Sequence, residues 1–360
     1  MSQSTSHENN FAILHVLGAC LVMYGHQIVL LGNVPLPIFT DSAQELGVEL
    51  IFTITGYLVT LSFLKEQKFG RFIAKRLIRI YPAYIFCILV SALVIGPIVT
   101  QCSLGEYFRY CWTYIANNLV FKPTYELPGV FANNIYPGAV NGSVWTLPLE
   151  IFMYFVISIL LMICLRSKKY GRQIYGGILI ALMAACMIKY YCFPEASLIF
   201  WNTDWLSLST VDDLCFIMMG SLYAALELKK FCNIQIASIV MLAGACLDFS
   251  KMDLVLVIIL PYFIISFAYC EKPFFSKWFS KNNIAYAMFL WGFPIQQTVL
   301  WIIREKLGME ISINKAFLIS VVITAGVACF SHRFIETPVE GFLKRVILGI
   351  GKKPKTAEIQ

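Results

Sequence analysis

Two histidines lie on one apolar segment near the start of the chain, and their spacing gives them a common helical face. Residues 11–31, FAILHVLGACLVMYGHQIVLL, carry His15 and His26 eleven positions apart. At about 100° per residue, eleven residues return to within roughly 20° of the same face, with about 16 Å of rise. The segment has the ~20-residue length of a membrane span. Ionisable groups inside a membrane are costly, so both are candidate functional residues, although each imidazole could simply hydrogen-bond a neighbouring helix.

Two carboxylates could serve as partners of a histidine base. Glu49 lies in GVELIFTITGYLV and Glu150 in NGSVWTLPLEIFMYFV, each near the start of an apolar run. The topology derived below brings both to about the depth of His26. A carboxylate orients an imidazole and makes it more basic, as a general base requires. The pattern therefore predicts a catalytic group of His26, Glu49 and Glu150, unless either glutamate is only solvated at the membrane boundary.

A basic cluster follows the second apolar run. Residues 65–79 hold six Lys and Arg. Lys75 and Arg79 are four positions apart and Arg76 and Arg79 are three apart, so we expect them on one side of a short helix that ends at Pro82. Such a cluster can bind phosphate groups through paired donors. The alternative is that the charges only orient the chain in the membrane.

The composition requires helices to position these groups within a membrane. Hydrophobic residues make up 59% of the 360 and charged residues 14%, against a usual charged fraction of about 25%. Mean hydropathy is +0.72. We expect an all-α, polytopic membrane protein with ten spans. The expected spans are residues 11–31, 45–64, 80–100, 146–165, 174–191, 208–227, 232–249, 252–270, 284–303 and 314–332.

The distribution of Lys and Arg predicts the orientation. One set of segments between spans holds 21 of the 28 Lys and Arg and the opposite set holds six. This bias places both termini in the cytoplasm and His26 in the outer half of its helix. It also explains the net charge of +7 without nucleic acid as a partner. The expected parts are a polar tail at 1–10, a transmembrane domain at 11–335 and a cytoplasmic tail at 336–360.

The N-terminus and the cysteines indicate few further functional features. The start MSQSTSHENN has no basic region or cleavage site, so the first apolar segment should be retained as a helix. Most of the twelve cysteines lie in apolar runs, and no Cys-x-x-Cys pair or Cys/His cluster has zinc spacing, so we expect no metal site. Cys102 and Cys111 fall on a predicted outer segment, where they could form a disulfide.

The longest predicted outer segment, residues 101–145, is rich in aromatic residues. Aromatic rings can stack on sugar faces, but they are also enriched at membrane boundaries. The segment therefore leaves both interpretations open. Its aromatic residues are Tyr107, Phe108, Tyr110, Trp112, Tyr114, Phe121, Tyr125, Phe131, Tyr136 and Trp145.

Six motifs in the same order make the chain resemble the acyltransferase 3 family. These membrane enzymes O-acylate sugars and other envelope components. The resemblance rests on a histidine eleven residues after a polar position in the first helix, and on five further stretches. They are GVELIFTITGYLV, FIAKRLIRIYPAY, NGSVWTLPLEIFMY, IAYAMFLWGFPIQQ and SHRFIETPVEGF. Each pattern is weak alone, but together they span most of the chain.

The resemblance implies roles for individual residues. His26 matches the catalytic histidine, and Arg76 and Arg79 match the arginine pair associated with the acyl-CoA donor. Trp145 and Glu150 match a Trp…Glu motif. Two further matches are Glu49, where an acidic residue follows Gly-Val, and Glu336 of the terminal Glu-x-Pro.

Two positions depart from the family pattern. His15 stands where the family usually has Arg or Lys, which puts a donor-anchoring role at this position in doubt because imidazole is only partly charged near neutral pH. Gly292 stands where many members have a histidine. This second departure recurs in members that end the motif as Pro294 to Gln297 do, so it indicates a subgroup.

The residues and the resemblance together predict a membrane O-acetyltransferase. Cytoplasmic acetyl-CoA is expected to bind Arg76, Arg79 and Lys75, with His15 nearby. His26 then deprotonates an acceptor hydroxyl or accepts the acyl group itself. The acceptor is expected to be a cell-surface polysaccharide or a lipid-linked sugar outside the membrane, held by Trp145 and Asn141.

The cell location, partners and competing functions complete the prediction. The expected location is the bacterial cytoplasmic (inner) membrane, with lipids as neighbours, and the sequence leaves the oligomeric state open. A transporter or flippase of an envelope precursor is the main alternative, since ten helices with buried polar groups are compatible with it. A sensor or scaffold descended from the enzyme is another.

Overall fold

The computed structural model describes residues 9–37, 41–192, 208–246, 252–270 and 284–349. Within these ranges the chain is helical, with two isolated β-bridges and no strand. This agrees with the all-α prediction. Seven of the described helical stretches are long and apolar enough to cross a membrane, so the chain has the features of a multi-pass membrane protein.

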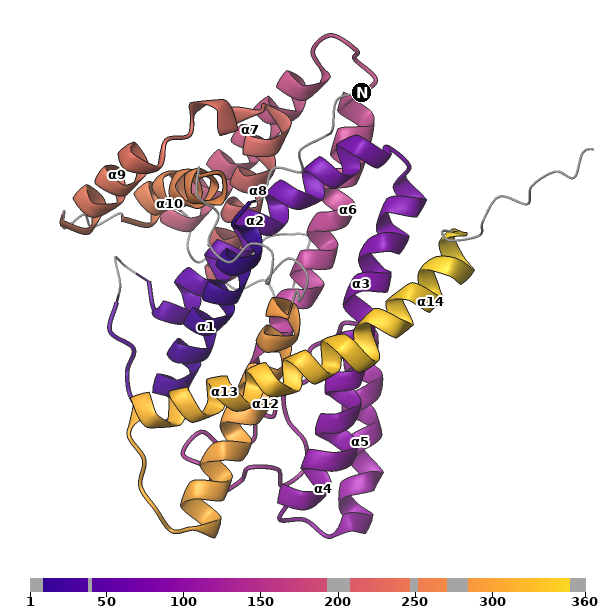
Figure 1. Cartoon of the computed structure of the whole chain (residues 1–360), viewed down its shortest axis with the longest axis vertical. Helices are drawn as coiled ribbons and strands as arrows, with labels where there is room; N and C mark the ends of the chain where they lie inside the picture. The colour runs from indigo at the N-terminus through magenta and orange to yellow at the C-terminus, as the bar shows by residue number, and fades with distance from the viewer. Residues whose placement is uncertain (1–8, 38–40, 193–207, 247–251, 271–283, 350–360) are drawn as a thin grey trace, which may run out of the picture.

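The helices are labelled in Figure 1. The first part of the chain forms α1 (Phe11–Leu30), α2 (Ala43–Glu66), α3 (Phe69–Val90), η1 (Ser91–Ile95), α4 (Gly96–Val99), α5 (Leu104–Leu119), η2 (Gly142–Trp145) and α6 (Thr146–Cys164). The second part forms α7 (Gly171–Cys192), α8 (Leu208–Ala225), η3 (Leu228–Phe231), α9 (Ile234–Cys246), α10 (Met252–Ala268), α12 (Ala285–Trp301), η4 (Ile302–Lys306), α13 (Ile313–Ser331), η5 (His332–Glu336) and α14 (Thr337–Leu348).

Seven of the ten expected spans coincide with long apolar helices in the described ranges. The other three, at 208–227, 232–249 and 252–270, coincide with shorter apolar helices, and residues 247–249 of the second lie outside the described residues. α9 has 13 residues and α10 has 17. These lengths rise about 20 to 26 Å, less than the ~30 Å of a bilayer core. The structure therefore supports seven spans, and the count of ten is not confirmed.

α2 is the central helix of the described bundle, and glycines let its neighbours approach closely. A Cβ on Gly47 would lie 2.7 Å from the carbonyl oxygen of Gly18 in α1. On the other face of α2, a Cβ on Gly56 would lie 2.0 Å from the carbonyl oxygen of Ile217 in α8. Small residues allow such backbone contact between membrane helices, where tight packing replaces the hydrophobic effect. α2 is thereby fixed between α1 and α8.

Lys75, Arg76 and Arg79 of the basic cluster lie inside a long helix, and the expectation that this helix ends at Pro82 was wrong. Pro82 is an interior residue of α3, which continues through η1 and α4 to Val99. A proline removes one backbone donor and usually kinks a helix. In a membrane the remaining backbone groups still need internal partners, which only a continuing helix supplies here. The arginine pair is therefore on the first half of a membrane-length helix.

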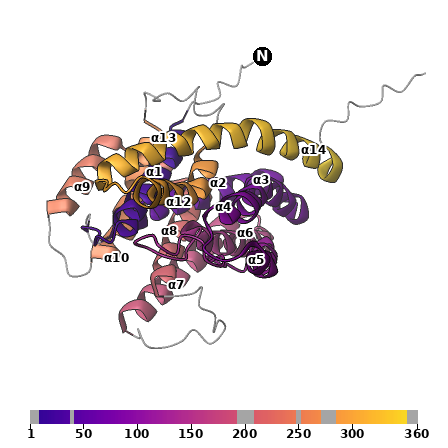
Figure 2. The ribbon, with the colours of Figure 1, turned by 90° about the horizontal axis from the view of Figure 1, so that it is seen from below.

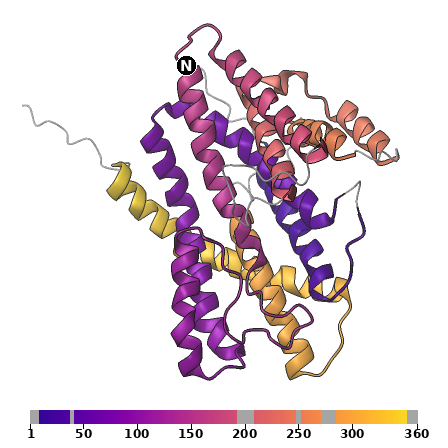
Figure 3. The same ribbon diagram turned by 180° about the vertical axis from the view of Figure 1, so that it is seen from behind.

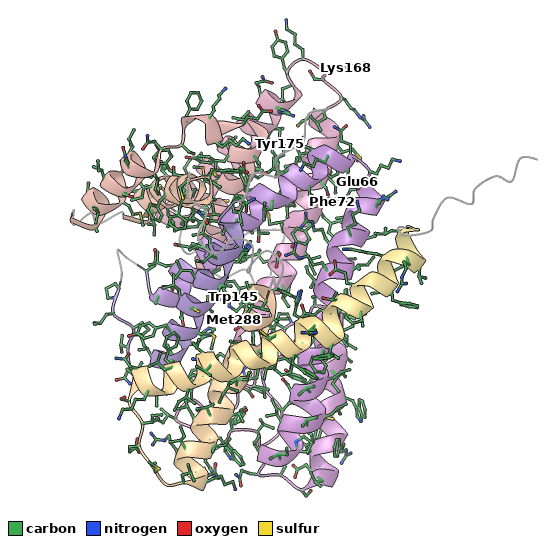
Figure 4. The ribbon with its side chains drawn as sticks, in the orientation of Figure 1. Glu66, Phe72, Trp145, Lys168, Tyr175 and Met288 are labelled. Atoms are coloured by element: carbon green, nitrogen blue, oxygen red, sulfur yellow. The ribbon has the colours of Figure 1, made fainter. Side chains whose placement is uncertain are left out.

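Two of the basic connections lie at the same end of the described structure. Figure 4 shows Glu66, beside the loop between α2 and α3, and Lys168, between α6 and α7, at the same end. The connection between α4 and α5 lies at the opposite end in Figure 1, and so does that between η4 and α13. Figure 3 shows the side where α5 and α6 lie in front.

α13, η5 and α14 form one continuous helical stretch along one side of the bundle, as Figure 2 shows. Near its middle the buried Glu336 accepts a hydrogen bond from Ser331 at 2.8 Å and lies 3.4 Å from His332 Nδ1. These short-range bonds satisfy a carboxylate that would otherwise be costly to bury. The boundary expected at residue 335 falls within this stretch.

Candidate active site

Two cavities lie inside the bundle, and the residues singled out in the sequence divide between them. The first, here called the inner cavity, has a volume of about 90 Å³. His15 of α1, Arg76 and Arg79 of α3, and Glu150 of α6 all line it. The other lining residues are Val48, Ile51, Phe52, Thr55, Leu58, Val59, Ile80, Thr146, Tyr154, Ala285, Tyr286 and Phe289.

The charges of the inner cavity form one connected group. The Arg76 guanidinium lies 5.5 Å from the ring centre of Phe72 and 5.8 Å from that of Tyr154, as in cation–π contacts. The Tyr154 hydroxyl donates a hydrogen bond to the Glu150 carboxylate. Both guanidinium groups lie close enough to Glu150 to stabilise its negative charge. Two arginines face one carboxyl group, so the cavity keeps a net positive charge that favours an anionic ligand.

Lys75 belongs to a different cluster. Its ammonium group pairs with Glu66, which also binds Arg71 at 3.2 Å. Lys75 is not among the residues that line the inner cavity. Lys75 therefore does not line the inner cavity with Arg76 and Arg79, because the end of its side chain reaches the Glu66 carboxylate next to the loop.

The second cavity, here called the outer cavity, has a volume of about 350 Å³. It contains His26 of α1 and Trp145 of η2, two residues that the sequence assigned to catalysis and acceptor binding. Its other lining residues are Val29, Leu30, Gln44, Tyr125, Glu126, Tyr136, Pro137, Ala139, Gly142 and Phe293. This mixture of aromatic rings with a few polar groups is typical of a small-molecule site.

The His26 ring is held by packing and not by a polar partner. It lies edge-on to Phe293, with ring centres 5.0 Å apart and planes at 81°. Its Nδ1 is buried, and no hydrogen-bond partner for it is found among the described residues. A catalytic histidine usually has a hydrogen-bond partner on its second ring nitrogen, which fixes its tautomer. The described part of the protein supplies no such partner to His26 Nδ1.

The expected grouping of Glu49 and Glu150 with His26 is not found. Glu150 lines the inner cavity with the arginines. Glu49 is buried, with 3% of its surface exposed, and lines neither cavity. Helical spacing places Glu49 on the stripe of α2 that continues through Thr53 and Gly56 to α8. Glu49 and Glu150 were expected at about the depth of His26, but a similar depth does not make side chains on different helices face the same cavity.

The segment before α6 explains why Glu150 lies away from His26. Trp145 lies at mid-height of the molecule in Figure 4, so α6 begins part-way along the bundle and not at one of its ends. Asn141 anchors this start: its Nδ2 donates to the Leu290 carbonyl at 3.0 Å and its Oδ1 accepts from the Ser143 amide at 3.0 Å. Asn141 is 1% exposed and lines neither cavity. The contacts of Asn141 therefore hold the start of α6 in place.

Two glutamines of α12 position the outer cavity, although their residue types and spacing alone indicate no role. Gln296 Nε2 donates to the Met23 carbonyl at 2.7 Å and to Gln27 Oε1 at 2.9 Å, which fixes the turn of α1 that carries His26. Gln297 Nε2 donates to the carbonyls of Tyr136 and Ala139, both at 2.9 Å. The Pro294–Gln297 ending noted in the sequence therefore ties α1 and the 136–139 loop to one helix.

Four parts of the chain contribute residues to both cavities, and one of them is α2, with Val48 in the inner cavity and Gln44 in the outer cavity. In α1, His15 lines the inner cavity and His26 lines the outer cavity. The corresponding inner and outer residues are Phe289 and Phe293 in α12, and Thr146 and Trp145 at the η2–α6 junction. Phe289 and Phe293 are one helical turn apart, a rise of about 6 Å. Trp145 and Thr146 are consecutive residues. We call the residues between the two cavities the wall, and at this junction its two faces belong to consecutive residues.

Gly292 is required by the packing of α1 against α12. A Cβ at this position would lie 2.7 Å from Met23 Cγ, so Met23 fills the space that a larger residue would need. We expect Gly292→Ala to destabilise the protein by about 1 to 3 kcal/mol, the usual cost of overpacking. Thermal unfolding in detergent measures this effect.

The matched control is Gly326→Ala in α13, where nothing lies within 4 Å of the added Cβ. It should leave the unfolding temperature unchanged or raise it, since alanine favours a helix over glycine. Equal unfolding temperatures for the two variants would contradict the assignment of Gly292 to close packing.

The remaining sequence predictions for cysteines and metals can be compared with the described residues. Cys102 and Cys111 are free thiols, so the disulfide that they could form is absent. No group of three His, Cys, Asp or Glu side chains within the described ranges comes together as a metal site.

Comparison with known proteins identifies the family. Residues 10–333 match the family model for the acyltransferase domain of the acyltransferase 3 family. An O-acetyl transferase of Shigella phage Sf6 is 25% identical over 306 residues, covering 82% of this chain and 86% of the phage protein. The nodulation protein 10 of Rhizobium leguminosarum is 31% identical over 177 residues, covering 47% of this chain and 48% of that protein.

A third relative is longer than this chain. The O-acetyltransferase OatA of Staphylococcus aureus is 22% identical over 336 residues, covering 83% of this chain and 53% of OatA. The chain thus spans about half the length of two of these three relatives. No solved structure matches it significantly. The match over 324 of its residues shows that the chain belongs to the acyltransferase 3 family and is an enzyme of the O-acetyltransferase class.

Proposed function

We propose that this protein transfers an acetyl group from acetyl-CoA on the cytoplasmic side to a hydroxyl of a cell-surface polysaccharide or lipid-linked sugar on the outer side. The observation that carries the proposal is the pair of cavities that the wall separates. The inner cavity has a net positive charge for an anionic donor, and the outer cavity has a histidine among aromatic residues for a sugar.

The orientation follows from the basic connections. Among the described residues, the basic connections between α2 and α3 and between α6 and α7 lie at the same end, as Figure 4 illustrates with Glu66 and Lys168. Basic loops favour the cytoplasm. In this orientation the inner cavity faces the cytoplasm and the outer cavity opens outside, in the bacterial cytoplasmic membrane.

The size of the inner cavity limits which part of the donor it holds. Ligand pockets usually measure about 300 to 1,000 Å³, so a cavity of about 90 Å³ admits only a narrow part of a large molecule. We assign it to the pantetheine arm and thioester. Arg79, which is exposed, and the half-buried Arg76 are then at the mouth, where they bind the phosphates. Glu150 keeps the two guanidinium groups in place.

His26 performs the transfer at the outer side of the wall. Its imidazole removes the proton from the acceptor hydroxyl, whose oxygen attacks the thioester carbonyl. The carbon–sulfur bond breaks, and the departing thiolate takes the proton to give free coenzyme A. If the imidazole accepts the acetyl group first, the acceptor oxygen attacks that acyl-histidine instead. Both routes use the same atoms and require only a short movement of the wall.

The test is a transfer assay across a sealed membrane. Liposomes that contain the purified protein are loaded with acetyl-labelled acetyl-CoA, and the glycan acceptor is added outside. We expect labelled glycan outside the liposomes. We expect no product when acetyl-CoA and the acceptor are both added outside, at an acetyl-CoA concentration low enough that none leaks inward. Free acetate without labelled glycan would contradict a transferase, and product from the one-sided mixture alone would contradict the sidedness.

A further inference from the structure

A third cavity adjoins the outer cavity and shares part of its lining. It has a volume of about 640 Å³, and Glu126 and Pro137 line both cavities. The other residues of this adjoining cavity come from α5 and from the loop that follows it. Those used below are Tyr110, Thr113, Tyr114 and Thr124.

Glu126 is fixed at the boundary between the two cavities by the loop backbone. Glu126 pairs with Ala139 in a β-bridge, and the Val140 amide donates to the Tyr125 carbonyl at 2.7 Å. Gly138 has a φ of +84°, and a Cβ there would lie 3.4 Å from the Glu126 carboxyl group. Gly138 thus allows the turn that brings the two sides of the loop together. The bond from Gln297 to the Ala139 carbonyl joins this loop to α12.

The two cavities together offer groups that suit a carbohydrate longer than one sugar. The outer cavity has aromatic faces, among them Trp145 and Tyr136, that can cover the apolar face of a sugar ring. The adjoining cavity has side chains with hydroxyl groups, such as Thr113 and Thr124. Between them, the Glu126 carboxylate can accept hydrogen bonds from hydroxyl groups on either side.

We propose that the adjoining cavity is a second acceptor subsite, which binds the sugar next to the one that is acetylated. This rests on the proposed function, since it assumes that the acceptor occupies the outer cavity beside His26. Glu126 then bridges the two sugars through their hydroxyl groups. The acceptor is an oligosaccharide of at least two neutral sugars, and a single sugar binds only half of the site.

The experiment compares acceptors of different length with the full-length protein in liposomes. The acceptors are size-fractionated oligosaccharides from partial hydrolysis of the source organism's own surface glycan, from one sugar upward. We expect kcat/KM to rise about tenfold or more from one sugar to two, as for one added charge-assisted hydrogen bond. Equal kcat/KM for all lengths would overturn the proposal, whereas no product with any acceptor would instead overturn the proposed function.

Two variants locate the effect. Thr113→Trp should obstruct part of the adjoining cavity and reduce the advantage of the longer acceptors, with the rate for a single sugar unchanged. Ala116→Trp is the control, because Ala116 is also exposed on α5 but does not line this cavity. Glu126→Gln should raise the KM for two-sugar acceptors about tenfold and leave kcat nearly unchanged. A loss that is equal for all acceptor lengths in Thr113→Trp would overturn the subsite.

Discussion

His26→Ala is expected to abolish acetyl transfer while the protein stays folded. Among the described residues that line the outer cavity, His26 has the only imidazole, and the one carboxylate, that of Glu126, belongs to a class of groups that are weaker bases than imidazole. Loss of a general base costs about 10² to 10⁴ in rate, and loss of a covalent acceptor costs more. Initial rates over a range of acetyl-CoA concentrations measure the effect.

His15→Ala is the matched control, because it removes the same side chain eleven residues earlier in the same helix. His15 lines the inner cavity, where its Nδ1 lies 2.9 Å from the Phe11 carbonyl oxygen. Its loss should therefore raise the KM for acetyl-CoA and leave a measurable kcat. A folded His26→Ala enzyme with normal rates would exclude the catalytic role of His26.

Replacing both Arg76 and Arg79 with glutamine is expected to weaken donor binding by about 3 kcal/mol or more, a factor above about 10². Each charge-assisted hydrogen bond to a phosphate is worth roughly 1.5 to 3 kcal/mol. The loss would leave the Glu150 carboxylate uncompensated, so Glu150→Gln is included in the variant to keep it folded. Calorimetry of acetyl-CoA binding in detergent measures the affinity.

Lys75→Gln is the control for general surface charge. Lys75 is on the same helix but pairs with Glu66, and such partly exposed ion pairs contribute only about 0 to 1 kcal/mol. Its donor affinity should change by no more than a few-fold. If the arginine variant binds acetyl-CoA as tightly as the wild-type protein, the basic cluster serves only to orient the chain.

Hydropathy and spacing predicted the parts of the structure that depend on one helix at a time. The apolar runs gave the long helices, and the three-residue spacing of Arg76 and Arg79 placed both on the same cavity. The eleven-residue spacing likewise gave His15 and His26 one common side of α1 at two depths. These relations follow from helix geometry alone, so no tertiary information was needed.

The assignments that depend on contacts between distant segments could not be read from the sequence. Glu150 was placed near His26 because an apolar run marks where a helix is hydrophobic, and not where a polar loop enters the bundle. Here the loop before α6 is buried through bonds such as that of Asn134 to Gln297 at 2.8 Å, over 163 residues. The pairing of Lys75 with Glu66 could not be read from the sequence for the same reason, since Glu66 lies on another helix.

The wall at Trp145 and Thr146 also has an electrical consequence. A membrane potential of 100 mV is worth about 2.3 kcal/mol for each elementary charge that crosses it. A continuous column of water through both cavities would dissipate that potential by leaking protons and ions. An acetyl group carries no charge, so in the proposed transfer the membrane potential neither drives nor opposes its passage. The proposed function therefore requires the residues between the cavities, Trp145 among them, to keep the two volumes of water separate.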